Sequence, residues 1–341
     1  MENKSKKLIS IGIAFLMCCF LVCGNNALAS NEKQPNYDEI SRQIAKDAEK
    51  YHIPGMAVIV VNADNILFQE TYGNCDSIDT PFLIGSMSKS FTALAVMQLV
   101  EDGKIDLNSS ISAYIDASKW FADSADCNKI TVRNLLNQTS GIATYQTFGE
   151  LKSTDSYGSH VYANVNYGLL GLIVEAVSGI SYDEYIANNI FTPLGMEHSA
   201  ATLKKSKENG LIDGYRNYFG IPIAGEPDYP EEIKDGTWMN IPAGYLSSSI
   251  SDIGRYLQMY LNDGENIISK ESIDIMRHIV IPIILLCIPL IVGIPFKVIW
   301  LFVKDLCLVL YINAGILITI GIYKLIFCCR KQLCWRKNSH K

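Results

Sequence analysis

The sequence predicts an α/β fold followed by C-terminal transmembrane helices. Two β-rich runs in residues 55–73 flank the turn residues Asn62 to Asn65, which is the pattern of a β-hairpin. Segments with helical spacing of apolar residues lie before and after this hairpin. Beyond residue 278 the composition changes to uncharged apolar runs. We therefore expect a globular domain over residues 30–278 and a transmembrane tail over residues 279–341.

Residues 1–29 predict a secretory signal peptide. Lys4, Lys6 and Lys7 form a basic start, and an uncharged apolar stretch follows them. Small residues at positions 27–30 provide a cleavage site after Ala29. The alternative is an uncleaved anchor helix. We expect the globular domain to be extracellular and held at the cell membrane.

The globular domain contains four segments with helical spacing besides the hairpin. They lie in residues 38–52, about 167–177, about 182–190 and 247–264. Gly179, Pro193 and Gly264 follow or end the last three of these segments, and both residue types stop helices. We therefore expect a sheet that is packed against several helices.

The tail contains two uncharged apolar runs, residues 279–296 and 306–323. Each is about 18 residues long, which is just enough to span a bilayer and contact its lipid. Residues 330–341 hold five Lys and Arg residues, and such basic ends stay on the cytoplasmic side. With the domain outside, two spans would return the C-terminus to the outside. Either one run does not cross, or a span is missing.

The globular domain is acidic, with 18 Lys and Arg residues against 33 Asp and Glu residues. Phosphate binding needs a basic surface, so this balance argues against a nucleic-acid partner. Only Cys75 and Cys127 lie between the signal and the tail, and the sequence does not decide whether they form a disulfide. The sequence has no CxxC pair and no HExxH motif, so no metal site is predicted.

The stretch PFLIGSMSKSFTALAVMQLVEDGKIDL, residues 81–107, places Ser86 three residues before Lys89. On a helix these two residues share a face. A serine hydroxyl becomes nucleophilic when a base takes its proton, and a neutral lysine can be that base. The pattern also fits an N-cap serine beside a surface lysine. The apolar helix that it opens, shortly after a hairpin, favours the catalytic interpretation.

A second polar pair is Tyr162 and Asn164, in the stretch YANVNYGLLG. In an extended segment, residues two apart point to the same side. A phenol can pass a proton to a leaving group, and an amide can hold a substrate carbonyl and the lysine. The alternative is a buried tyrosine beside an ordinary turn asparagine.

Four ordered stretches together resemble the serine β-lactamase and penicillin-binding protein family, in its class C-like branch. They are residues 82–115, ITVRNLLNQTSGI (130–142), residues 162–199 and PAGYLSSSISDIGRYLQMYLNDG (242–264). The second is similar to the segment LLxHTSG of that branch, with Gln138 where histidine is usual. The resemblance covers about residues 38–278.

This resemblance implies an α+β sandwich of the β-lactamase/transpeptidase-like type. It implies Ser86 as the acylated nucleophile, Lys89 as its base and Tyr162 as the partner acid and base. Asn164 would position the substrate and the lysine. The reaction would be acyl transfer from a D-Ala peptide of peptidoglycan, a β-lactam or a small ester, and no cofactor would be needed.

The family also has a Lys/His-Thr/Ser-Gly or His-x-Gly motif on a strand beside the nucleophile, and no such motif follows Asp263. A backbone N–H of that strand would complete the oxyanion hole, and losing one such donor lowers rates by about a hundred- to a thousand-fold. We therefore expect an incomplete sheet that lacks its C-terminal strands. One deletion of those strands and of one membrane span would explain this absence and the uneven span count.

The sequence leaves two functions open. The first is a membrane-anchored extracellular serine hydrolase of the D-Ala-D-Ala carboxypeptidase or β-lactamase kind. The alternative is a catalytically impaired or inactive cell-wall binding protein, or a truncated remnant of such an enzyme. A Ser-His-Asp hydrolase is disfavoured because the sequence has no G-x-S-x-G elbow.

Overall fold

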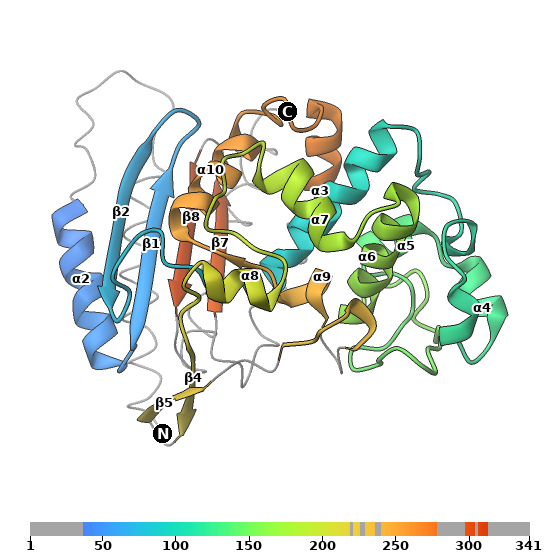
Figure 1. Cartoon of the computed structure of the whole chain (residues 1–341), viewed down its shortest axis with the longest axis horizontal. Coiled ribbons are helices and arrows are strands. Elements are labelled where there is room, and N and C mark those ends of the chain that lie inside the picture. The colour runs from blue at the N-terminus through green and yellow to red at the C-terminus, as the bar shows by residue number, and fades with distance from the viewer. Residues whose placement is uncertain are drawn as a thin grey trace, which may run out of the picture.

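The computed structural model of the chain (Figure 1) describes most of the predicted globular domain and two segments of the tail. The described residues are 37–218, 221–225, 229–235, 240–277, 297–303 and 306–312. The predicted signal peptide and the apolar run 279–296 lie outside the described residues.

The main sheet has the strand order β2-β1-β8-β7 and all neighbouring strands are antiparallel. β1 (Gly55–Val61) and β2 (Ile66–Gly73) form the predicted hairpin, in which Gly55 pairs with Gly73. The turn is fixed by Asn62, whose Oδ1 accepts hydrogen bonds from the backbone N–H groups of Asp64 (3.0 Å) and Asn65 (2.7 Å).

Two strands come from the tail, and here the structure differs from the expected incomplete sheet. β7 (Lys297–Val303) and β8 (Leu306–Ile312) pair with each other, and β8 pairs with β1 from Met56–Ile312 to Val61–Cys307. Residues 306–312 of the second predicted span are thus a strand, and its remainder lies outside the described residues. A short apolar run has the same composition in a membrane span and in a buried strand, so its sequence alone does not separate them.

Helices cover the sheet. Every residue of β1 is buried, which is expected of a central strand covered on both faces. α2 (Tyr37–Lys50) packs against β2, where Tyr37 stacks on Phe68 at 5.4 Å between ring centroids. α10 (Ile250–Leu261) packs against β1 and β8. Figure 1 shows α2 on the far side of the hairpin from the helical part of the molecule.

The helical part surrounds α3 (Ser88–Glu101). All residues of α3 from Ser88 to Met97 are buried, so the helix is enclosed on every side. It packs against α6 (Asn164–Ser178), α7 (Tyr182–Ile186) and α9 (Ile241–Gly244).

The predicted helix over residues 167–177 is present as α6, which starts three residues earlier, at Asn164, and ends before the left-handed Gly179. The helix predicted over 182–190 begins as α7 and continues as a single π-helical turn, Ala187–Phe191, before Pro193. The predicted helix in 247–264 corresponds to α10, and β6 (Ser247–Ser248) precedes it.

Shorter elements complete the described structure. They are β3 (Phe82–Leu83), which pairs with β6, η1 (Gly85–Met87), η2 (Ile111–Ala113), η3 (Ala117–Trp120), α4 (Ser124–Lys129), α5 (Val132–Leu136), α8 (Leu203–Glu208), the hairpin β4 (Gly214–Tyr218) and β5 (Ile221–Gly225), and η5 (Ile233–Asp235).

Cys75 and Cys127 are both buried free thiols, so the possible disulfide is not formed in this structure. In the described part of the chain, no single helix has the length and apolarity of a membrane span. α6 together with the segment Tyr182–Phe191 has enough of both, but this pair bends by 80°. Both members also contribute to the buried core of the domain.

We predict that Gly171→Val destabilises the protein by about 1–3 kcal/mol, the usual cost of overpacking a core. Gly171 lies in α6 where a Cβ atom would collide with the ring of Pro242 in α9, and a proline ring cannot move aside. The free energy of unfolding of the purified full-length protein, from urea denaturation, measures this effect. Gly225→Val is the matched control, because no atom lies within 4 Å of its Cβ position. Equal stability of the two variants would contradict the prediction.

Candidate active site

Ser86 lies in η1, the turn that joins β3 to α3. Gly85 precedes it with φ +55°, a left-handed conformation that glycine adopts at little cost. Ser88 fixes the turn, since its hydroxyl donates to the Gly85 carbonyl (2.7 Å) and accepts from the Leu246 N–H (3.1 Å). The turn therefore presents Ser86 beside the N-terminal end of α3, where the helix dipole favours negative charge.

Lys89 is completely buried, and its amine donates three hydrogen bonds. The acceptors are Ser86 Oγ (3.3 Å), Asn164 Oδ1 (2.8 Å) and the backbone carbonyl of Ala243 (2.6 Å). A buried amine must be hydrogen-bonded in this way to be tolerated. Of the three partners only Ser86 has a proton to give, because the other two are carbonyl oxygens. A charged lysine amine donates three hydrogen bonds, whereas a neutral one donates two and has a lone pair. With its two N–H groups bonded to the carbonyl oxygens, neutral Lys89 can take the proton of Ser86 on that lone pair.

Tyr162 contacts the same serine. Its hydroxyl lies 2.6 Å from Ser86 Oγ, and its ring centroid lies 4.8 Å from Lys89 Nζ. Ala163 is extended (φ −138°) and Asn164 begins α6, so the side chains of Tyr162 and Asn164 reach the same site as the sequence predicts. The structure thus brings together all four predicted site residues.

Sequence analysis missed the third acceptor of Lys89. The Ala243 carbonyl belongs to α9, a four-residue helix that packs on both α3 and α6. A backbone carbonyl has no residue signature. The only available signal was the stretch PAGY at residues 242–245, which is part of the family resemblance.

β7 contacts the η1 turn, which contains Ser86. It is therefore the strand on which the Lys/His-Thr/Ser-Gly or His-x-Gly motif of the family is expected. Its sequence, KVIWLFV, contains neither Lys/His-Thr/Ser-Gly nor His-x-Gly. In the described structure, the residues that could activate Ser86 are therefore in place, and the expected motif is not on the strand beside it.

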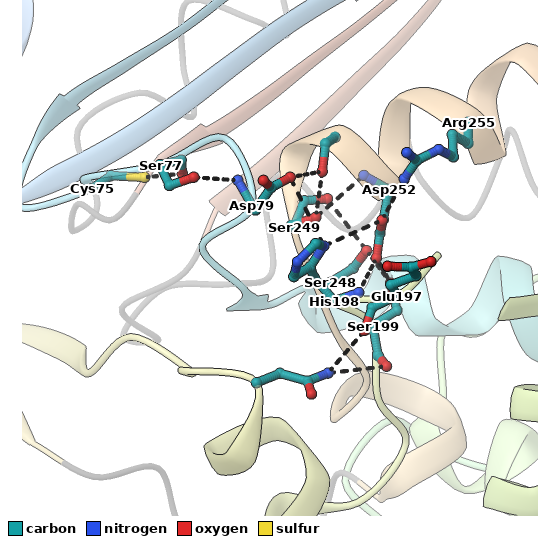
Figure 2. A network of polar contacts seen from close by, with 12 residues as sticks. Cys75, Ser77, Asp79, Glu197, His198, Ser199, Ser248, Ser249, Asp252 and Arg255 are labelled. Carbon is teal, nitrogen blue, oxygen red and sulfur yellow. Dashed lines mark hydrogen bonds and ion pairs between the residues drawn. The ribbon is translucent and has the colours of Figure 1, made fainter. Parts of the chain in front are cut away.

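A buried carboxylate, Asp252, belongs to a hydrogen-bond network that supports the η1 turn. Figure 2 shows Asp252 between His198, Ser199 and Arg255. Asp252 Oδ2 accepts from the His198 N–H (2.8 Å) and from Ser199 Oγ (2.7 Å), and its Oδ1 accepts from Arg255 (2.9 Å). Ser199 also hydrogen-bonds Ser248 in β6 (2.8 Å). Because β6 pairs with β3, this network holds the strand that leads to Ser86.

The described residues contain no group of three or more His, Cys, Asp or Glu side chains placed to hold a metal ion. The four site residues offer one amine, one amide and two hydroxyl groups. Such a set can move protons to and from a serine nucleophile, which is the chemistry of acyl transfer.

Comparisons with known proteins show which family and fold the chain matches. Residues 40–278 match the family described as Beta-lactamase. The chain is similar to Protein flp of Staphylococcus aureus (strain NCTC 8325 / PS 47), with 29% identity over 261 residues that cover 68% of this chain and 50% of that protein. It is also similar to Penicillin-binding protein 4 of Amycolatopsis lactamdurans, with 26% identity over 258 residues that cover 67% of this chain and 66% of that protein.

The first of these curated relatives is matched over only about half of its length. Among solved structures, a class C β-lactamase superposes with a TM-score of 0.67 and 20% sequence identity, covering 86% of this chain and 97% of the other. This similarity shows the predicted α/β β-lactamase-like fold.

We predict that wild-type protein gains stability relative to Asp252→Asn as the pH falls from 7 toward 4. Burial raises the pKa of Asp252, and hydrogen bonds from Ser199 and His198 offset this only in part. The folded state therefore keeps its proton to higher pH than the unfolded state does. The resulting contribution to stability is present below the unfolded pKa of about 3.9 and is lost as the pH rises through the folded pKa. Urea denaturation of both proteins across this range measures the difference.

Asp263→Asn is a control of opposite sign. The hydrogen bond from Lys270 holds the pKa of Asp263 below its usual range, so wild type should lose stability relative to this variant as the pH falls. The same trend for both variants would show that the Asp252 prediction is wrong.

Proposed function

Because the chain belongs to the beta-lactamase family, we propose that it is a serine hydrolase that acts through an acyl-enzyme on Ser86. The observation that supports this most directly is the position of the Ser86 hydroxyl. It lies within hydrogen-bond distance of both Lys89 (3.3 Å) and Tyr162 (2.6 Å), and Lys89 is oriented by Asn164. No other described serine is assigned a role in the reaction.

In the proposed reaction, Ser86 Oγ attacks the substrate carbonyl carbon while its proton passes to Lys89 or Tyr162. The tetrahedral intermediate then collapses, and Tyr162 protonates the leaving group as the bond to the carbonyl carbon breaks. Water then attacks the carbonyl carbon of the resulting ester and gives a proton to Lys89 or Tyr162. The bond from that carbon to Ser86 Oγ breaks, the proton passes to Oγ, and the acyl group leaves as a carboxylic acid. Asn164 holds the lysine and contacts the substrate. The chemistry needs no cofactor.

The proposed substrates are a D-Ala peptide of peptidoglycan, a β-lactam or a small ester. The resemblance to penicillin-recognising enzymes supports this class, and one relative is named as a penicillin-binding protein. The proposal therefore covers carboxypeptidase and β-lactamase activity as one class of acyl transfer to Ser86.

We predict that a fluorescent penicillin or a fluorophosphonate labels the full-length protein in membranes. Ser86→Ala should abolish the labelled band, since the acylated oxygen is absent. Tyr162→Phe and Lys89→Met should each slow labelling by about a hundred- to ten-thousand-fold, the usual contribution of a general acid or base. The labelling rate at several probe concentrations is the measurement.

Ser90→Ala is the matched control, because Ser90 is a buried serine of α3, four residues after Ser86, whose hydroxyl bonds the Met87 carbonyl (2.8 Å) and forms no hydrogen bond with any of the four site residues in the described structure. It should leave labelling intact. If wild-type protein is folded and protease-resistant but is not labelled, the hydrolase proposal is wrong.

A second candidate is a non-catalytic cell-wall binding protein or a remnant of such an enzyme. The observation that favours it is the sequence of β7, which contacts the nucleophile turn without the expected motif. An unlabelled but folded protein that still binds purified peptidoglycan would support this candidate.

We also propose that the domain is extracellular and is held at the cell membrane by the tail. Because β7 and β8 belong to the sheet of the domain, the anchor would follow β8, in the apolar stretch 313–329, whose only charged residue is Lys324. The five basic residues of 330–341 support a cytoplasmic end. A signal peptide over residues 1–29 would direct export.

We predict that alkaline carbonate leaves the full-length protein in the membrane fraction. External protease should digest the globular domain of intact cells and spare an epitope placed after Lys341. Release by carbonate would exclude the anchor, and digestion of the epitope would exclude a cytoplasmic end.

A further inference from the structure

Gln138 has three properties, each of which is unfavourable for the stability of the folded protein. It follows α5 in a left-handed conformation (φ +59°), which residues other than glycine rarely adopt. Its polar side chain is completely buried. Its amide nitrogen Nε2 has no hydrogen-bond partner among the described residues. Backbone strain and incompletely bonded buried groups persist where the surroundings enforce them, and they occur often near functional sites.

The backbone N–H of Gln138 bonds the Leu135 carbonyl, and its other hydrogen bonds are directed at residues 161–166, the segment that holds Tyr162. Its backbone carbonyl accepts from the Val161 N–H (2.8 Å), and its Oε1 accepts from the Ala163 N–H (3.0 Å). One residue therefore binds the backbone on both sides of Tyr162. The left-handed conformation allows this, because it turns the chain after α5 so that the carbonyl and the side chain of Gln138 both meet the same segment.

The same side chain also fixes the start of α6. Gln138 Oε1 accepts a second hydrogen bond, from Asn166 Nδ2 (2.5 Å), and Asn166 Oδ1 accepts from Ser140 (2.8 Å). Gln138 Oε1 thus bonds both Ala163 and Asn166, and Asn164 lies between these two residues in the sequence. Both Tyr162, which contacts Ser86, and Asn164, which contacts Lys89, are thus on a stretch that is held by Gln138.

We propose that Gln138 is a positioning residue that sets the distance between the Tyr162 hydroxyl and Ser86. This inference rests on the proposed function, since it assigns the geometry of that reaction. Gln138 acts through the backbone of Val161 and Ala163. A small displacement of this backbone would lengthen the 2.6 Å contact of Tyr162 with Ser86, and misplacement of a reacting group by about 1 Å can cost a hundred-fold in rate.

The first test compares labelling rates by fluorescent penicillin in membranes that contain the full-length protein. Gln138→Met keeps the length of the side chain and removes the acceptor, and it should slow labelling by about ten- to a hundred-fold. Gln138→His should restore most of the rate, because a ring nitrogen can accept from the Ala163 N–H and histidine is usual at this position in the family.

The matched control is Thr131→Ala. It removes the capping box at the other end of α5, where the Thr131 hydroxyl accepts from the Asn134 N–H. It therefore destabilises α5 without removing a hydrogen bond to residues 161–166. The rate of labelling by fluorescent penicillin should stay within about three-fold of wild type. Equal loss of rate in Gln138→Met and Thr131→Ala, or no rescue by histidine, would overturn the positioning role and leave a structural one.

A second readout does not depend on activity. With 3-fluorotyrosine in the full-length protein, the ¹⁹F resonance of Tyr162 is identified by its loss in Tyr162→Phe. Ser86→Ala should shift this resonance in the wild-type background, because the two hydroxyl groups are in contact, and should shift it little in the Gln138→Met background. An equal shift in both backgrounds would overturn the proposal. If the wild-type protein is not labelled at all, the proposed function fails, and the ¹⁹F comparison still decides whether Gln138 places Tyr162.

Discussion

The structure of the helical part depends on the buried amine of Lys89. A lysine can be enclosed in protein only if its N–H groups are bonded, and here the acceptors come from three separate places in the chain. One is in η1, directly before α3, one begins α6 and one is a carbonyl of α9. The three helices must therefore converge on one point. Gly171 permits this convergence, since only a residue without a side chain lets α6 approach the Pro242 ring so closely.

The η1 turn, which contains Ser86, is also fixed by contacts with the strands β3 and β6. β3 and β6 form a two-residue pairing, which is too short to be stable alone. Asp252 and Ser199 attach β6 to the loop before α8, and the Ser88 hydroxyl attaches the turn to Leu246. The position of Ser86 thus follows from buried polar contacts on both sides of the turn, and removing one member would leave its partners unbonded.

The sequence allowed the site side chains and much of the fold to be predicted. The hairpin followed from β-rich runs around turn residues. Helical spacing made Ser86 and Lys89 a candidate pair, and the alternation of an extended segment did the same for Tyr162 and Asn164. Their roles were implied by the family resemblance. The Ala243 carbonyl could not be predicted, because any residue offers a carbonyl. The strands β7 and β8 were missed because uncharged apolar runs suit a bilayer and a buried sheet equally well. Gln138 was noticed only as a departure from a family pattern, since its contacts depend on a left-handed backbone that the sequence does not reveal.

The strand order also determines how late in its synthesis the molecule can complete its fold. β1 is complete by residue 61, yet its second neighbour in the sheet, β8, begins at residue 306. Likewise Lys89 finds its last acceptor only when Ala243 has been made. Contacts between such distant parts of a chain form slowly and late. A nascent chain therefore cannot complete the hydrogen bonds of the Lys89 amine before residue 243 has been made, or the pairing of β1 with β8 before residue 312 has been made. Until then β1 has an unpaired edge, so this part of the fold is completed late in synthesis.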